Sequence, residues 1–223
     1  SQILNILEPF DLKEMYATDP ATFTHVVAEA MKPAFADRAF WLGDGDFVKV
    51  PRGLIRKEYA TTLSQAINVQ EVSVVERQGA PQDWDSSSFG KHTTHLTVVD
   101  SQGNWVAITQ TINTSFGSKV VVPGTGVMLN NEMDDFSIQP GVPNAFGLIG
   151  GEANAIAPGK RPLSSMSPTI VLRDDTPVMT VGAAGGPKII TQVVLAITRH
   201  LDLGLPLDEA ISAPRFHHQW VPN

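Results

Sequence analysis

The sequence has 223 residues, of which 42% are hydrophobic, and its formal net charge at neutral pH is −7. A chain of this length forms one large domain or two small ones, and its composition is typical of a globular protein with a buried core. The negative charge argues against nucleic acid and acidic membrane surfaces as main partners. There is no cysteine, which excludes disulfides, thiol catalysis and cysteine-bound zinc.

The two ends of the sequence resemble cut ends. The chain opens in a helical pattern without Met or a signal peptide, and it stops without a clear helix or strand ending. No apolar run approaches the roughly 18 residues needed to span a bilayer. We therefore expect an excerpt of a longer protein whose localisation signal lies outside this segment.

The first third of the sequence predicts helices. Asp19 is suited to cap a helix, and Pro20 suits the first helical position. Apolar residues then recur at helical spacing, at Phe23, Val26, Val27, Ala30, Met31 and Ala34. Gly43 and Gly45 end this segment. Residues 70–92 are polar and have no lasting period, which favours a linker or a surface loop.

From Thr93 onward the pattern changes to β. The segments THLTVVD and NWVAITQTIN alternate apolar and polar residues and predict a hairpin. A second hairpin, SPTIVLRD with PVMTVGAAGG, turns at Asp174 and Asp175. PKIITQVVLAITRHLDLG predicts a buried helix closed by Gly204, and LPLDEAISAP predicts a short amphipathic helix. This order indicates an α+β fold with antiparallel sheets and helices on their faces.

Thr93 stands between the polar stretch and the first strand. A threonine hydroxyl is a poor nucleophile and needs a nearby base. A free α-amino group has a pKa of about 7.7 to 8.0, so a threonine at a chain start carries its own base. Breaking the bond between His92 and Thr93 would create such a group. The alternative is that Thr93 and Thr94 are only β-branched strand residues.

Two polar motifs further along have both a functional and a structural interpretation. In NNEMDDF, Glu132 and Asp135 suit an ammonium group, although the motif also fits a turn with a solvated acidic face. In PLSSMSP, the hydroxyls of Ser164 and Ser165 can donate to a carboxylate. The same serines can instead bond their own backbone in a proline-flanked loop.

Glycines and histidines form the last candidate motifs. The adjacent Gly185 and Gly186 let backbone amides approach a developing oxyanion closely. Their motif, GAAGGPK, lacks the ending of a phosphate-binding loop. His217 and His218 are neighbours whose side chains diverge, which favours structural histidines over a metal site.

Four long blocks occur in the order of a known family. They are TTHLTVVDSQGNWVAITQTINTSFGS, LNNEMDDFS, PGVPNAFGLIGGEANAIAPGKRPLSSMSPTIV and APRFHHQW. Together they resemble the γ-glutamyltranspeptidase family, most strongly from Thr93 to Asn223. That family belongs to the N-terminal nucleophile hydrolases, which have a four-layer αββα sandwich. The resemblance implies that this chain forms part of such a sandwich.

The resemblance also implies how the chain is divided. Members of the family are precursors that cut themselves into a large and a small subunit. Residues 1–92 would be the C-terminal part of the large subunit, ending in a flexible segment before the cleavage site. Residues 93–223 would be the small, catalytic subunit, incomplete at its C-terminus.

For the matching positions, the resemblance implies individual roles. Thr93 would be the nucleophile, both for cleavage between His92 and Thr93 and for turnover, and Thr111 would orient it. The substrate-binding and oxyanion-binding roles would fall to Asn113, Glu132 and Asp135 for the α-amino group, Ser164 and Ser165 for the α-carboxylate, and the N–H groups of Gly185 and Gly186 for the oxyanion.

The implied reaction moves a γ-glutamyl group from glutathione or glutamine to water, an amino acid or a dipeptide, through an ester on Thr93. Large and small subunits of one precursor would form a heterodimer. The resemblance implies no metal and no organic cofactor, and a periplasmic or secreted location.

The sequence departs from the family at three points. The arginine that clamps the substrate carboxylate lies upstream of this segment, Phe146 replaces a lid tyrosine of some members, and Glu132 replaces a glutamine of some bacterial members. Two alternatives remain open. One is a relative of the cephalosporin (glutaryl) acylases, against which Asp135 argues, and the other is an unprocessed, inactive structural homologue.

Overall fold

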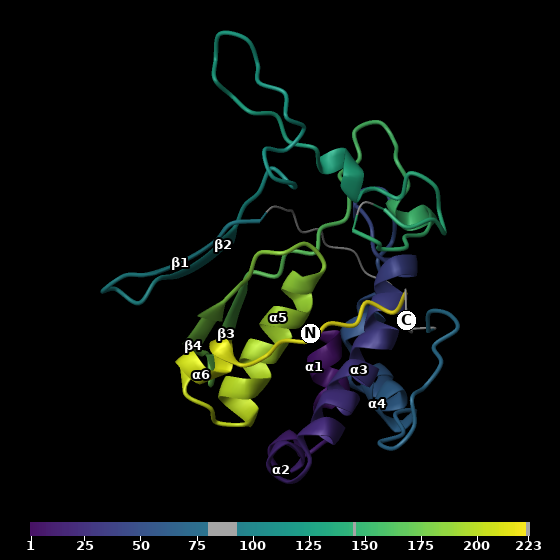
Figure 1. Ribbon diagram of the computed structural model, residues 1–223, viewed down its shortest axis with the longest axis vertical. Coiled ribbons are helices and arrows are strands. Elements are labelled where there is room, and N and C mark those ends of the chain that lie inside the picture. The colour runs from purple at the N-terminus through teal and green to yellow at the C-terminus, as the bar shows by residue number, and fades with distance from the viewer. Residues whose placement is uncertain (80–92, 145, 222–223) are drawn as a thin grey trace.

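The computed structural model in Figure 1 describes residues 1–79, 93–144 and 146–221. The chain begins with the helices α1 (Gln2–Leu7), α2 (Leu12–Thr18), α3 (Pro20–Trp41) and α4 (Lys57–Gln65). Two hairpins follow, β1 (His95–Val99) with β2 (Trp105–Thr109), and β3 (Thr169–Arg173) with β4 (Thr176–Val181). The remaining elements are α5 (Lys188–Ile197), a π-helical stretch (Thr198–Asp202), α6 (Leu207–Ser212) and the 3₁₀ turns η1 (Arg52–Ile55), η2 (Glu132–Asp135) and η3 (Glu152–Asn154). This confirms the predicted order of elements.

Helix α3 begins where the sequence predicts. The carboxylate of Asp19 accepts hydrogen bonds from the N–H groups of Ala21 at 3.0 Å and Thr22 at 3.2 Å. These are two of the amides that have no partner inside a helix. Pro20 fills the first helical position, where its missing N–H costs nothing.

Within the described residues, no helix is long and apolar enough to cross a bilayer.

The first hairpin, β1 with β2, forms at the predicted place. Its strands pair antiparallel, with His95 opposite Thr109. The turn is held by Asp100, whose carboxylate accepts from the N–H groups of Gln102 and Asn104, each at 2.9 Å. Aspartate favours such turns because its short side chain can bond to the backbone two residues on.

The second hairpin also turns where predicted. Asp174 and Asp175 have φ angles of +48° and +62°. Two left-handed residues in succession are typical of a type I′ turn, whose twist matches that of antiparallel strands. The ladder shifts register between Val171 and Leu172, where the strand carries an irregularity.

The helix predicted up to Gly204 changes form before it ends. Regular α5 stops at Ile197, and the chain continues as a π-helix. The first π residue, Thr198, is completely buried, and its hydroxyl donates to the carbonyls of Val194 at 3.1 Å and Leu195 at 3.3 Å. This hydroxyl competes for the carbonyls that would accept the regular helical bonds.

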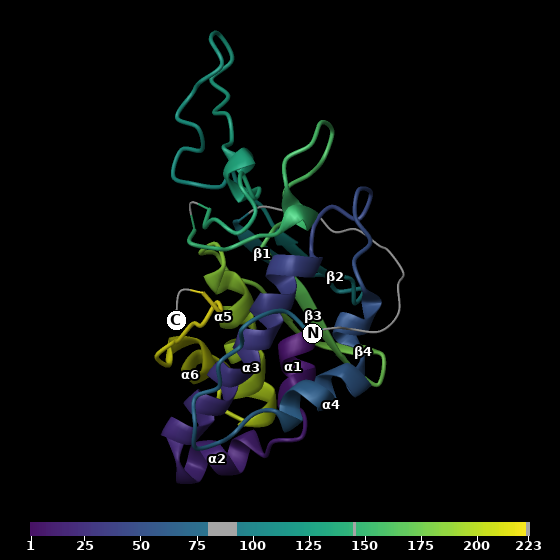
Figure 2. The same cartoon turned by 90° about the vertical axis from the view of Figure 1, so that its right-hand side faces the viewer.

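Helix α5 lies between the second hairpin and the N-terminal helices (Figures 1 and 2). One side of α5, with Val194 and Leu195, joins the core formed by α1, α2 and α3. Its other side, with Ile189 and Val193, packs on Met179 of β4. Helix α5 therefore packs between the N-terminal helices on one side and the second hairpin on the other.

The first hairpin projects from this body (Figure 1). One face of the hairpin carries exposed apolar side chains. Leu96 pairs with Ile108 and Val98 pairs with Val106, so all four side chains share a face. We call these four residues the hairpin patch. Each of them is at least 40% exposed. An uncovered, two-stranded apolar surface of this kind promotes association between chains.

The hairpin patch should limit the solubility of residues 1–223 produced alone. We expect this chain to self-associate and to bind the dye ANS, and we expect Val98→Thr combined with Ile108→Thr to reduce both effects. Threonine keeps the β-branched shape, so the strands are retained. Sedimentation velocity and ANS fluorescence provide the measurements. Val72→Thr is the control, because Val72 is 74% exposed but lies outside the sheets; an equal improvement from this control would contradict the prediction.

Candidate active site

A small pocket gathers most of the predicted site residues. It is lined by Thr93, Thr111, Asn113, Glu132, Asp135, Phe146, Ser164, Ser165, Met166, Gly186 and Ile189. Of the predicted residues, Gly185 adjoins the pocket through Gly186 but does not line it, and His92 lies outside the described residues. These positions are spread over nearly a hundred residues of sequence, so tertiary structure assembles the pocket.

The register of the first hairpin brings Thr93 close to Thr111. The pairing of His95 with Thr109 continues outward, because the N–H of Gln110 donates to the carbonyl of Thr94 at 2.5 Å. Two residues beyond His95 on one strand and beyond Thr109 on the other are Thr93 and Thr111. Since side chains alternate along a strand, both threonines share a face with His95 and Thr109. This face is opposite the hairpin patch.

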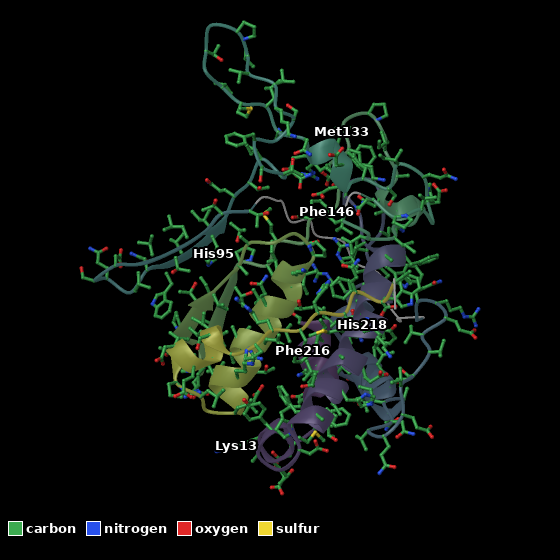
Figure 3. All side chains as sticks on the ribbon, in the orientation of Figure 1. Lys13, His95, Met133, Phe146, Phe216 and His218 are labelled. Carbon is green, nitrogen blue, oxygen red and sulfur yellow. The ribbon has the colours of Figure 1, made fainter. Side chains whose placement is uncertain are left out.

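His95 anchors the same face, and Figure 3 shows it at the base of the hairpin. Its Nδ1 lies 2.9 Å from the hydroxyl of Thr109. A Cβ atom built on Gly182 would lie 2.1 Å from this imidazole nitrogen, so only glycine fits after β4. Burial lowers the pKa of His95 below its ordinary value. A neutral imidazole therefore packs beside the threonine pair at neutral pH.

Asn113 is held in the pocket by its backbone and by its side chain. Its φ is +76°, a left-handed conformation that asparagine tolerates better than most residues. The N–H of Asn113 donates to the Thr111 hydroxyl at 2.9 Å, and its side-chain amide donates to the carbonyl of Asn131 at 3.1 Å. The oxygen of the Asn131 side chain in turn accepts from the N–H of Thr114 at 3.1 Å. Asn131 is a supporting residue that sequence reasoning missed.

The acidic motif forms the 3₁₀ turn η2, and it is not a solvated face. Glu132 and Asp135 both line the pocket, and the carboxylate oxygens of Glu132 are buried. Met133 lies between them in the sequence and is 56% exposed, so another side of the turn faces solvent. The 3₁₀ geometry accounts for this, because residues three apart eclipse one another on the same side of the turn.

Buried Asn154 ties this turn to the serine segment. Its side-chain amide donates to the carbonyl of Asp135 at 2.8 Å, and its side-chain oxygen accepts from the N–H of Leu163 at 2.8 Å. A single side chain thereby fixes the spacing between the acidic residues and the serines. Asn154 carries no sequence signal that sets it apart from an ordinary loop asparagine.

Both serine hydroxyls accept hydrogen bonds from the protein. The Ser164 hydroxyl oxygen accepts from the N–H of Met166 at 3.1 Å, as expected for a serine in a local turn. The Ser165 hydroxyl oxygen accepts from Nη2 of Arg38 at 2.9 Å. A hydroxyl that accepts still has its own proton to donate. The structural and functional interpretations of these serines are therefore compatible.

Arg38 of α3 is a further residue of this region that sequence reasoning missed. Ser165 lies 127 positions along the chain from it, and no local pattern links the two. Arg38 and Asp135 line a neighbouring cavity together. Burial lowers the pKa of Arg38 to about 10, and the negative charge of Asp135 opposes this shift. The guanidinium therefore stays charged at neutral pH.

The two predicted oxyanion glycines precede α5 and have positive φ angles, +130° at Gly185 and +59° at Gly186. A Cβ on Gly186 would lie 3.1 Å from the ring of Phe146. Phe146 thus closes one wall of the pocket directly over the glycine. The start of a helix also favours negative charge, which suits a developing oxyanion.

The adjacent histidines 217 and 218 make separate protein contacts. Nδ1 of His217 lies 3.0 Å from the Thr191 hydroxyl, and its ring meets Phe35 edge to face at 5.7 Å. His218 accepts from the N–H of Trp220 at 3.0 Å. Across the described residues, no three His, Asp or Glu side chains cluster in a way that could hold a metal ion.

A larger cavity of about 560 Å³ between α1, α2 and the π-helical stretch contains none of the predicted site residues.

Comparisons with known proteins agree with this geometry. Residues 1–223 match the family described as Gamma-glutamyltranspeptidase. The glutathione hydrolase proenzyme of Escherichia coli K12 is 49% identical over 225 residues, which is 100% of this chain and 38% of that protein. A mutant γ-glutamyltranspeptidase from Helicobacter pylori is 55% identical with a TM-score of 0.57, covering 58% of this chain and 70% of its own. The cephalosporin acylase of Bacillus halodurans is 29% identical with a TM-score of 0.78, covering 96% and 35%.

An α+β arrangement of helices and antiparallel hairpins, with a threonine at the head of a strand in the pocket, defines the class of N-terminal nucleophile hydrolases. Within that class, the chain belongs to the γ-glutamyltranspeptidase family. It spans about 38% of the length of the first curated relatives that it matches.

Gly186→Ala should damage the site more than it damages the fold. The new methyl group meets the Phe146 ring, and the left-handed conformation strains any alanine by about 1 kcal/mol. The predicted oxyanion role of Gly186 implies that kcat of the full-length protein for an acyl-transfer substrate would fall roughly 100-fold in this variant, as is typical when one oxyanion donor is displaced. Gly159→Ala is the matched control, since Gly159 has a φ of +73° with no atom within 4 Å of its Cβ position. Urea unfolding should report similar losses for both variants, and equal losses of kcat would contradict the role of Gly186.

Proposed function

We propose that the protein containing this chain is a γ-glutamyl hydrolase and transferase that cuts itself before Thr93. One observation carries the proposal: Thr93 shares a pocket with two carboxylates and two serine hydroxyls that suit the two charged groups of a glutamyl substrate. The relative from Escherichia coli, which is named a glutathione hydrolase proenzyme, supports it.

Self-cleavage would begin with attack of the Thr93 hydroxyl oxygen on the carbonyl carbon of His92. The C–N bond between the two residues breaks, the hydroxyl proton passes to the leaving nitrogen of Thr93, and the acyl group moves to the Thr93 oxygen as an ester. Water then hydrolyses this ester, leaving a carboxylate on His92 and a free amine on Thr93. The Helicobacter pylori chain covers 58% of this chain, close to the share that follows His92, which supports a small subunit of residues 93–223.

The substrate would bind through both of its charged ends. Asn113, Glu132 and Asp135 would hold its α-ammonium group, where charge-assisted hydrogen bonds are strong. The O–H groups of Ser164 and Ser165 would donate to its α-carboxylate, because each oxygen already accepts a bond from the protein. This orientation presents the γ-carbonyl carbon to Thr93.

In turnover, the Thr93 amine would take the proton of its own hydroxyl as the oxygen attacks the γ-carbonyl carbon. The N–H groups of Gly185 and Gly186 would stabilise the resulting oxyanion. The leaving amine receives the proton, and a γ-glutamyl ester forms on Thr93. Water or the amine of an amino acid or dipeptide then attacks this ester and regenerates the hydroxyl.

The substrate and partner assignments follow from the same proposal. Glutathione or glutamine would supply the γ-glutamyl group, and the two processed subunits would remain together as a heterodimer. Every step uses protein groups and water. A periplasmic or secreted location remains a proposal that comes from the family resemblance.

The direct test is the appearance of a new N-terminus. Purified full-length protein, incubated at neutral pH, should yield a chain that begins Thr-Thr-His-Leu, as read by intact mass and N-terminal sequencing. Thr93→Ala should remain a single chain, because alanine has no nucleophilic oxygen. A single intact chain from folded wild-type protein would instead favour the unprocessed structural homologue.

A cephalosporin-acylase-like activity is the second candidate. The TM-score of 0.78 over 96% of this chain favours it, although the identity is only 29%. The choice depends on Asp135, because a glutaryl group lacks the amine that this carboxylate would bind. We expect Asp135→Asn to lower kcat/KM roughly 10- to 100-fold for a γ-glutamyl anilide and far less for the glutaryl anilide. Equal losses would count against γ-glutamyl specificity.

A further inference from the structure

The segment that carries the two serines is clamped by charged residues of the N-terminal part of the chain. At one end, the backbone N–H and Nε of Arg161 donate to the Asp44 carboxylate at 2.9 Å and 3.0 Å. Nη2 of Arg161 reaches the second Asp44 oxygen at 2.5 Å. At the other end, Arg38 donates to Ser165. The side chain of Asp44 is buried, and its hydrogen bonds with Arg161 hold its pKa well below the ordinary range.

The chemistry of Arg38 fixes the direction of the Ser165 hydroxyl. A guanidinium has only donors, so the Ser165 oxygen must accept from it. Once one lone pair is used in this way, the single proton of the hydroxyl points elsewhere and can be donated. A local amide imposes the same direction on Ser164. The two neighbouring hydroxyls are therefore prepared as a pair of donors.

Arg38 also lies between the two halves of the proposed substrate site. It donates to Ser165 on the carboxylate side, and its charge acts on Asp135 on the ammonium side. A positive charge at this place favours a substrate carboxylate nearby and balances the acid that would receive the ammonium group.

We propose that Arg38 is a positioning residue for the substrate α-carboxylate, acting through the Ser165 hydroxyl, while the pair of Asp44 and Arg161 fixes the other end of the serine segment. The inference rests on the proposed γ-glutamyl activity and deepens it. Because Arg38 precedes Thr93 and Ser165 follows it, the contact would join the two subunits after cleavage. One subunit would thereby tune the substrate specificity of the other.

The test uses the full-length processed protein and three anilide donors with different charges. The γ-glutamyl anilide has both charged groups, the glutaryl anilide lacks the amine, and the 4-aminobutanoyl anilide lacks the α-carboxylate. We expect Arg38→Met to raise KM roughly tenfold or more for the two donors that carry the carboxylate. Their kcat values, and kcat/KM for the 4-aminobutanoyl donor, should stay within about twofold of wild type.

Two further variants separate positioning from structural support. Arg38→Lys keeps the charge but loses the planar fork, so its KM should lie between those of wild type and Arg38→Met. In a Ser165→Ala background, Arg38→Met should add little, because residues that act through one another are not additive. Arg173→Met, at an exposed position that ends β3, is the control for losing an arginine and should match wild type.

The outcomes distinguish this inference from the proposed function. Absence of γ-glutamyl turnover by the processed wild type would overturn both. The inference alone would be overturned if the wild type turns over the γ-glutamyl donor but Arg38→Met loses kcat/KM equally for all three donors. It would also be overturned if the effects of Arg38→Met and Ser165→Ala on KM multiply in the double variant. The Tm of Arg38→Met, and whether its two subunits stay together, show whether this variant folds. If it does not, the same comparisons are made with Arg38→Lys, alone and combined with Ser165→Ala.

Discussion

The antiparallel register of β1 with β2 is the constraint on which the site depends. Because His95 faces Thr109, the ladder sets Thr93 against Thr111 and places both on the inner face of the hairpin. A slip of one residue would exchange the two faces and bring the apolar hairpin patch to the pocket. Gly182 locks this arrangement, since only a residue without Cβ can lie against the His95 ring. Register, not strand formation as such, therefore determines whether the threonines can act together.

Helix α3 organises the remainder through its buried polar residues. Asp37 is fully buried and accepts hydrogen bonds from Tyr59 and Gln2 at 2.7 Å and 2.6 Å, and from the N–H of Gly79 at 2.7 Å. Burial raises the pKa of Asp37, while these donors oppose the shift. Its neighbour Arg38 turns toward the serine segment. Buried charges cost free energy unless they are fully hydrogen-bonded, so each of these contacts fixes a distant segment in one position.

Much of the fold could be predicted from the sequence because local chemistry specifies it. Asp19 and Pro20 mark the start of α3, Asp174 and Asp175 mark a turn, and Gly204 closes the last long helix. The π-helical stretch after α5 could not be predicted, because it forms where the buried Thr198 hydroxyl bonds to the carbonyls of Val194 and Leu195. For the site, long motifs supplied the candidate residues, and their individual roles stay predictions although a single pocket contains most of them.

The elements, the family and the candidate nucleophile can be inferred from the sequence alone, since they depend on residue types and on their order along the chain. Tertiary structure alone decided what surrounds them. It joined Arg38 to Ser165 across 127 residues, and Asn154 to both Asp135 and Leu163. Hydrogen bonds between distant segments leave no periodic or local signature in a single sequence. Such partners become visible only once the backbone has brought them within about 3 Å of each other.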